Sequence, residues 1–211
     1  MFKKLLNKYK KSKLIKDNLI LFISNFITGA LVFLFHFFSG RYLGPADYGT
    51  VGVILSIVYI FNIPLTTIQT GIANFTANFK AKNKLKEISY LFRSSIKRLS
   101  IFGAICLILF LILSPLIASY LKIKTILLIL LSPFILFIFL VPVIRGILQG
   151  LQRFKALGLN LLFEGVSKFV LGIILVILLQ VNGAVISIVL SYIIAFFLGY
   201  FLLRKILIEK I

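Results

Sequence analysis

Three kinds of residue on which many functional sites depend are scarce in this chain. Its 211 residues include one Cys, one His and five acidic residues. Cys106 has no partner for an intramolecular disulfide. No two of the acidic residues form a plausible carboxylate pair for acid–base catalysis. The sequence has no Cys/His cluster with metal-ligand spacing and no Walker A or Rossmann glycine pattern. We therefore expect no enzyme activity, no cofactor and no metal site.

The chain also lacks a linker. No stretch is rich in Gly and Ser or in Pro, and the composition does not change along the sequence. Hydrophobic residues make up 61% of the chain and its mean hydropathy is +1.12. A soluble domain of this length buries a normal core with far less apolar material. The composition predicts one membrane domain.

Six apolar runs are long enough to cross about 30 Å of hydrocarbon as helices. The first is about twice as long as the apolar region of a signal peptide and no cleavage site follows it, so we interpret it as a transmembrane helix. Lipid leaves no partner for unpaired backbone groups, and no alternating-strand pattern predicts a barrel. The expected fold is an all-α bundle, with spans at residues 19–39, 49–73, 99–120, 125–144, 160–180 and 184–203.

The positive charge alternates along the chain. Of the 24 Lys and Arg residues, seven precede the first span, and the gaps after the six spans hold one, seven, two, three, none and three; Lys168 lies inside a span. Lys and Arg of short loops stay on the cytoplasmic side. We therefore predict a multi-pass protein of the cytoplasmic (inner) membrane, with a basic cytoplasmic N-terminus at 1–18 and a cytoplasmic C-terminal end at 204–211. The net charge of +19 is explained by the lipid bilayer, and no nucleic-acid partner is expected.

Small residues recur every fourth position in two places. One seam, in the last span, consists of Ser187, Ser191, Ala195 and Gly199, and a second is Gly146-x-x-x-Gly150. Such seams let helices approach closely, so they predict packing and not function. Proline inside spans two to four predicts bent helices. The basic loop 74–98 is moderately amphipathic and predicts a short cytoplasmic surface helix beside anionic lipid.

Polar residues share one face in each of the first two spans. These faces are Asn25, Gly29, Val32 and His36 in the first span and Asn62, Thr66, Gln69 and Thr70 in the second. Polar groups inside a membrane need protein or water partners, so both faces should look inward. Two interpretations stay open, a hydrated cavity or interhelical hydrogen bonds without a cavity. His36 is a candidate for ion coupling, although a His near the outer interface costs little.

Glu164 and Lys168 stand at i and i+4 in the fifth span, the favoured order for a helical ion pair. A charge at that depth costs on the order of 2–3 kcal/mol unless a partner or water offsets it. The pair predicts a functional site that could bind an anionic headgroup or exchange partners. In the alternative interpretation, Lys168 extends to the cytoplasmic interface and Glu164 accompanies it.

Two segments resemble a known family. Arg41-Tyr-Leu-Gly-Pro-Ala-Asp-Tyr-Gly49 resembles the turn after the first helix of the polysaccharide-repeat, O-antigen (Wzx-type) flippases. These belong to the superfamily of multidrug/toxin extruders and lipid II flippases. Arg145-Gly-Ile-Leu-Gln-Gly-Leu-Gln-Arg-Phe154, followed by Glu164 and Lys168, is similar to a second family stretch. In this turn Asp47 can cap the next helix, and Arg41 can pair with Asp47 or bind phosphate.

The resemblance implies a transporter that moves polyprenyl-phosphate-linked oligosaccharide repeats across the membrane. Lys168, Arg145 and Arg153 would attract the phosphate, with Glu164 and Arg41 as further candidates, and Asn25, Asn62 and Gln69 would bind sugar. A small-solute or multidrug extruder of the same superfamily and a non-transporting assembly subunit are the alternatives. A membrane transferase ranks third, because the acid–base residues are missing.

Family members are roughly twice as long and have two six-helix lobes. The chain resembles the first lobe, so we expect a truncated product, one half of a split gene or a half-transporter. Alternating access needs two lobes, which predicts a second six-helix lobe or self-association as partner.

Overall fold

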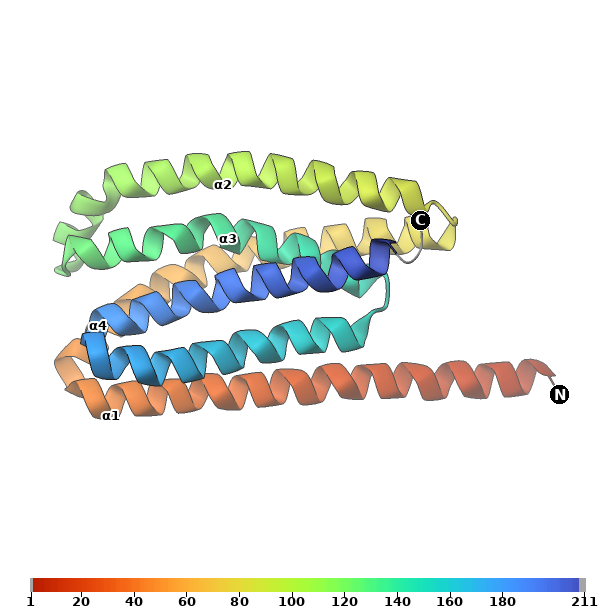
Figure 1. The fold of residues 1–211 in the computed structure, drawn as a ribbon, viewed down its shortest axis with the longest axis horizontal. Helices are drawn as coiled ribbons and strands as arrows, with labels where there is room; N and C mark the ends of the chain where they lie inside the picture. The colour runs from red at the N-terminus through yellow and green to blue at the C-terminus, as the bar shows by residue number, and fades with distance from the viewer. Residues whose placement is uncertain (1, 209–211) are drawn as a thin grey trace.

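A computed structural model describes residues 2–208 as four helices, and no strand occurs in that range. They are α1 (Phe2–Ala81), α2 (Leu85–Leu121), α3 (Thr125–Gly150) and α4 (Phe154–Ile208) (Figure 1). All four are long and apolar enough to cross a membrane. The all-α membrane fold predicted from the apolar runs is confirmed.

Two of the helices reverse direction. The backbone of α1 is non-helical at Gly44 (φ 77°, ψ 173°), a conformation that glycine adopts at low cost, and Pro45 follows. The backbone of α4 is non-helical at Gln180 (φ 52°, ψ −129°). Each helix therefore has a first and a second arm, 2–43 and 45–81 in α1, 154–179 and 181–208 in α4, and the two arms run in opposite directions along the bundle (Figure 1). The hydrogen-bonding pattern gives four helices, so a count of six spans stays a prediction.

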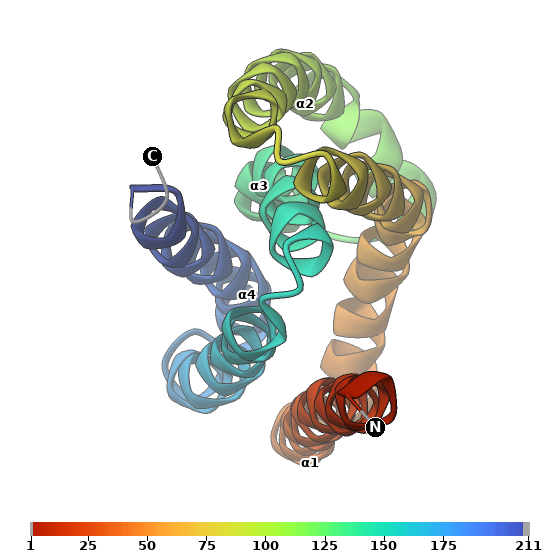
Figure 2. The ribbon, with the colours of Figure 1, turned by 90° about the vertical axis from the view of Figure 1, so that its right-hand side faces the viewer.

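The two ends of the bundle differ in charge. Both described chain ends lie at one end, together with the α1–α2 and α3–α4 turns (Figures 1 and 2). We call this the termini end. The breaks at Gly44 and Gln180 and the α2–α3 turn form the opposite, turn end. The gaps that carry most of the Lys and Arg residues thus meet at the termini end, as the alternating charge pattern requires.

Helix α3 is the centre of the bundle. Figure 2 shows it between α2, α4 and the second arm of α1, and its side chains supply most of the largest fully buried residues. The helix continues past both of its prolines and ends only at Gly150. Arg145 therefore lies within α3, one turn from its end, and the expectation that it follows the span in a cytoplasmic gap is wrong.

Helix α2 contains the segment predicted to be a surface helix. Residues 85–98 are its first turns and continue without a break into the apolar run. The sequence explains this, because neither Gly nor Pro occurs between Leu85 and Phe102 and nothing there ends a helix. The separate surface helix is not formed.

Both small-residue seams pack as predicted. A Cβ atom on Gly146 would lie 2.7 Å from the carbonyl oxygen of Gln69, and one on Gly150 would lie 2.5 Å from that of Ala73. The second arm of α1 thus touches the backbone of α3. The seam of the last span is buried along its length, and a Cβ on Gly199 would lie 2.8 Å from Ile144 of α3.

Candidate functional site

Arg145 is the centre of a polar cluster inside the bundle. Its Nε donates a hydrogen bond of 2.8 Å to Oδ1 of Asn160, and its Nη2 forms an ion pair with Oε2 of Glu164. The side chains of Arg145 and Glu164 are only 13% and 17% exposed. Such a pair holds its geometry because breaking it leaves a buried charge without compensation. The pair joins α3 to the first arm of α4.

Asn160 extends the cluster to the second arm of α4. It is fully buried, and its Nδ2 donates a hydrogen bond of 2.6 Å to the carbonyl oxygen of Ala195. A Cβ on Gly199 would lie 2.9 Å from that Nδ2, so the small-residue seam makes room for the amide. Asn160 is not among the residues predicted from the sequence. It precedes Glu164 and Lys168 by four and eight residues, and extending that i, i+4 pattern by one turn would have found it.

A cavity of about 130 Å³ borders the cluster. Its polar lining consists of Asn62, Thr66, Gln69, Arg145 and Tyr192. The Tyr192 hydroxyl donates to Oδ1 of Asn62 at 3.4 Å, and Nε2 of Gln69 donates to Oε1 of Gln149 at 3.0 Å. The space is large enough for a few water molecules. The predicted face of the second span therefore combines both interpretations, interhelical hydrogen bonds and a polar cavity.

The predicted face of the first span does not look inward. Asn25 and Gly29 are exposed, and the Asn25 amide donates to the Leu21 carbonyl of its own helix at 2.9 Å. The first arm of α1 packs through a neighbouring face, in which Ser24, Thr28 and Phe35 contact α4. The physical reason is a stripe of glycines on α4, which leaves room for these side chains. An added Cβ would lie 2.5 Å from Ser24 at Gly158, 3.0 Å from Thr28 at Gly165 and 2.4 Å from Phe35 at Gly172.

The predicted Glu164–Lys168 ion pair is also wrong. Glu164 pairs with Arg145, and the Lys168 amino group lies 5.4 Å from the centre of the Phe35 ring. An ammonium group at this distance is attracted by the face of the ring. Among the described residues, no ion pair involves Lys168. Arg145, Glu164 and Lys168 together carry two positive charges and one negative charge, so this group has a net charge of +1.

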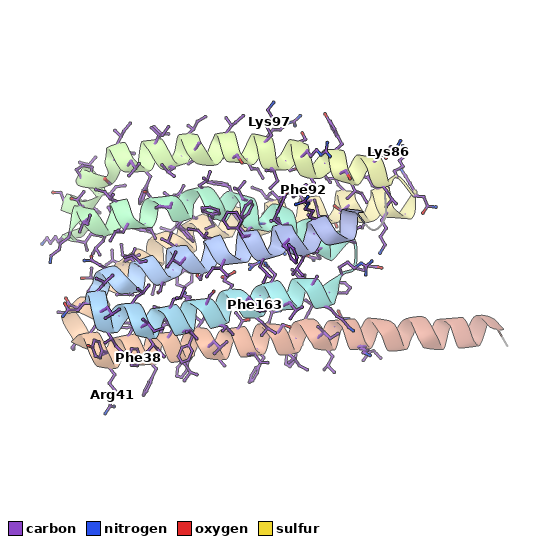
Figure 3. The ribbon with its side chains drawn as sticks, viewed as in Figure 1. Phe38, Arg41, Lys86, Phe92, Lys97 and Phe163 are labelled. Carbon is purple, nitrogen blue, oxygen red and sulfur yellow. The ribbon has the colours of Figure 1, made fainter. Side chains whose placement is uncertain are left out.

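Of the remaining candidates, the two arginines lie apart from the cluster, and His36 lies near Lys168, with its ring 5.3 Å from that of Phe35. Arg41 is exposed and points away from the bundle (Figure 3). Within the described range it forms no ion pair with Asp47, which lines a separate cavity of about 240 Å³ at the turn end beside Lys122 and Lys124. Arg153 is exposed in the α3–α4 turn. His36 contacts the second arm of α1 through a 3.2 Å hydrogen bond between its Nδ1 and the Tyr48 hydroxyl.

Proteins with a similar sequence or a similar fold are known. An uncharacterized membrane protein of Methanocaldococcus jannaschii is 29% identical over 180 residues, which cover 82% of this chain and 41% of that protein. A MOP superfamily transporter from Pyrococcus furiosus matches with a TM-score of 0.71 and 21% identity, covering 90% of this chain and 45% of its own. A MATE protein in complex with MaD3S matches with a TM-score of 0.75 and 21% identity, covering 90% and 46%.

The chain thus spans less than half the length of each of these relatives, and the likeness to the solved structures shows the fold. It is the fold of part of a MATE-type transporter. The model of the family described as polysaccharide biosynthesis protein matches residues 14–210, nearly the entire chain. The chain belongs to the polysaccharide biosynthesis protein family.

Proposed function

We propose that this chain is one lobe of a membrane transporter that moves polyprenyl-phosphate-linked oligosaccharide repeats across the cytoplasmic membrane. The observation that carries the proposal is the family match over residues 14–210. The buried cluster supports it, because a net charge of +1 among Arg145, Glu164 and Lys168 suits an anionic substrate. The charge pattern supports cytoplasmic termini.

Lys168 is the best candidate for the phosphate contact. The guanidinium of Arg145 already serves Glu164 and Asn160, so its charge is largely compensated inside the protein. The Lys168 amino group lies beside an aromatic ring, and among the described residues it forms no ion pair within 4 Å. In this proposal Arg145 and Glu164 hold the helices in place, and Asn62 and Gln69, which line the polar cavity, offer hydrogen bonds to sugar.

A second lobe completes the transporter in this proposal. The superfamily structures that match are about twice as long as this chain. A site between two lobes needs polar groups on the surface that meets the other lobe. Asn25, Thr66 and Thr70 are exposed polar residues on α1 and are the candidates for that surface.

The test is restoration of surface glycan in a flippase-deficient strain that expresses this chain together with a second lobe. We expect Lys168→Gln to reduce restoration at least tenfold at equal expression. Lys155→Gln, which removes the same charge from an exposed site at the termini end, should restore glycan fully. Full restoration by both Lys168→Ala and Arg145→Ala would show that neither residue binds phosphate.

The same strains separate the alternatives. An extruder of small solutes would lower the accumulation of a cationic dye and leave surface glycan unrestored. An assembly subunit would restore glycan equally well with Lys168→Ala, compared at equal amounts of folded protein, because its role needs no substrate contact.

A further inference from the structure

The first turns of α2 carry a basic stripe that the packing of the bundle does not use. Lys86, Tyr90, Arg93 and Lys97 stand at i, i+4, i+7 and i+11, which places them on one face of the helix. All four are exposed, and Tyr90 is 71% exposed. Figure 3 shows Lys86 and Lys97 pointing away from the bundle. We call these four residues the α2 stripe.

The opposite face of the same turns holds the helix in place. Ile88 is fully buried in the cluster that α3 forms with the ends of α1 and α4. The Phe92 ring lies 6.1 Å from that of Tyr200 on α4. Glu87 lies off the stripe and pairs with Lys84 at 3.7 Å. The stripe is therefore rigid, and no acid lies within it.

The stripe extends beyond the lipid. The apolar run of α2 starts at Leu99, so at 1.5 Å per residue Lys97 lies about 3 Å and Lys86 about 20 Å from the start of that run. The headgroup layer adds roughly 5–8 Å to each side of the hydrocarbon. Lipid headgroups thus reach Lys97, while Tyr90 and Lys86 stand beyond them.

A second copy of the chain does not fit the stripe. The chain has five acids against 24 basic residues, and two of the acids are already paired in Glu164–Arg145 and Glu87–Lys84. A complementary surface must supply several carboxylates and a contact for an exposed aromatic ring. Tyr and Arg are enriched at protein interfaces for this kind of contact.

We propose that the α2 stripe is a docking surface for an acidic segment of a partner protein. The stripe recognises carboxylates through Lys86, Arg93 and Lys97, and Tyr90 packs against the segment. This inference does not depend on the substrate of the transporter, because the stripe and the Arg145 cluster share no residue.

The binding test uses the full chain in nanodiscs of phosphatidylcholine and a fluorescein-labelled 16-residue peptide of Glu and Ala. We expect Lys86→Gln/Arg93→Gln to weaken peptide binding about five- to tenfold by fluorescence anisotropy, since each exposed pair contributes up to about a factor of five. Lys155→Gln/Arg204→Gln removes the same charge from exposed sites at the same end and should change binding less than twofold. Adding Tyr90→Ala to Lys86→Gln/Arg93→Gln should weaken peptide binding further. Equal losses in the two double variants would overturn the proposal.

Lipid quenching tests the alternative occupant, an anionic membrane surface. A bimane label is placed by Lys86→Cys or Lys97→Cys in a Cys106→Ser background, in discs that contain phosphatidylglycerol and a headgroup spin-labelled lipid. We expect strong quenching at position 97 and at least threefold weaker quenching at position 86. Equal quenching at both positions would place the whole stripe among headgroups and overturn docking of a protein. Circular dichroism and elution volume establish that each variant is folded.

Discussion

The two arms of α1 carry similar polar patterns and use them differently. In the first arm, Asn25 is exposed and bonds to a carbonyl of its own helix. In the second arm, Gln69 bonds to Gln149 of α3 and Asn62 bonds to Tyr192 of α4. The same kind of sequence pattern thus leads to an exposed face in one arm and to partly buried hydrogen bonds between helices in the other, where only Thr66 and Thr70 remain exposed and bond to their own helix.

The small residues of the neighbouring helix explain the difference. Gly146 and Gly150 let α3 touch the backbone of the second arm beside Gln69. Gly158, Gly165 and Gly172 of α4 instead accept Ser24, Thr28 and Phe35 of the first arm. Close approach maximises packing contacts, which are the main attraction between helices in lipid. The rotation of each arm therefore follows the glycines of its partner more closely than its own polar residues.

The largest expected effect comes from breaking the network at its centre. Arg145→Ala leaves the Glu164 carboxylate buried without its partner, which costs about 3–5 kcal/mol of the free energy of unfolding. The free energy of unfolding is measured by SDS titration in mixed micelles. Glu164→Ala should also destabilise, and the double variant should cost clearly less than the sum of both. Additive effects would show that the two charges do not interact.

Next in size is the loss of close approach. Gly150→Leu places side-chain atoms against the backbone of Ala73, and overpacking of this kind costs about 1–3 kcal/mol. Gly29→Leu is the matched change in the first arm, where no atom lies within 4 Å of the added Cβ. The same unfolding measurement should give Gly29→Leu no loss. A similar loss in both variants would mean that the glycines do not set the packing.

A smaller effect is expected where the network reaches the second arm of α4. Asn160→Ala removes hydrogen bonds to Arg145 and to the Ala195 carbonyl. Hydrogen bonds between helices in lipid contribute on average about 0.6 kcal/mol each, so we expect the loss of two to cost about 1–2 kcal/mol. Asn74→Ala changes an exposed Asn outside the network and is the control. Equal stability of the two variants would argue against the bridging role of Asn160.

Much of this fold could be predicted because lipid allows few alternatives. Apolar runs predict helices, alternating charge puts both ends of the chain on one side, and four-residue seams predict close packing. Arg145, Glu164, Asn62 and Gln69 were all recognised as candidates from the sequence. The sequence predicts the end of α3 too early, because a charged residue normally marks the end of a span, whereas Arg145 has a buried partner in the next helix.

The pairings within the site could not be predicted. An i, i+4 pattern favours Glu164–Lys168, but Arg145 reaches the same carboxylate from another helix, and sequence spacing does not show which helices are neighbours. The inward face of the first arm was mispredicted for a related reason. The pattern that indicates the inward face is the row of glycines on α4 spaced seven residues apart. It lies in a different helix from the residues whose orientation it determines.

The smallest expected effect on stability is at Asn25, on the exposed face of the first arm. Asn25→Leu removes a bond within one helix at an exposed position, so the free energy of unfolding of this chain should change by less than about 0.5 kcal/mol. Surface-glycan restoration with the second lobe present should nevertheless fall, because the exposed amide then faces that lobe or the sugar. Lipid tails offer the Asn25 side chain no hydrogen-bond partner. Gly29→Leu changes the same face and tests in the same way whether it contacts the second lobe. A variant that keeps both stability and restoration would show that this face contacts lipid alone.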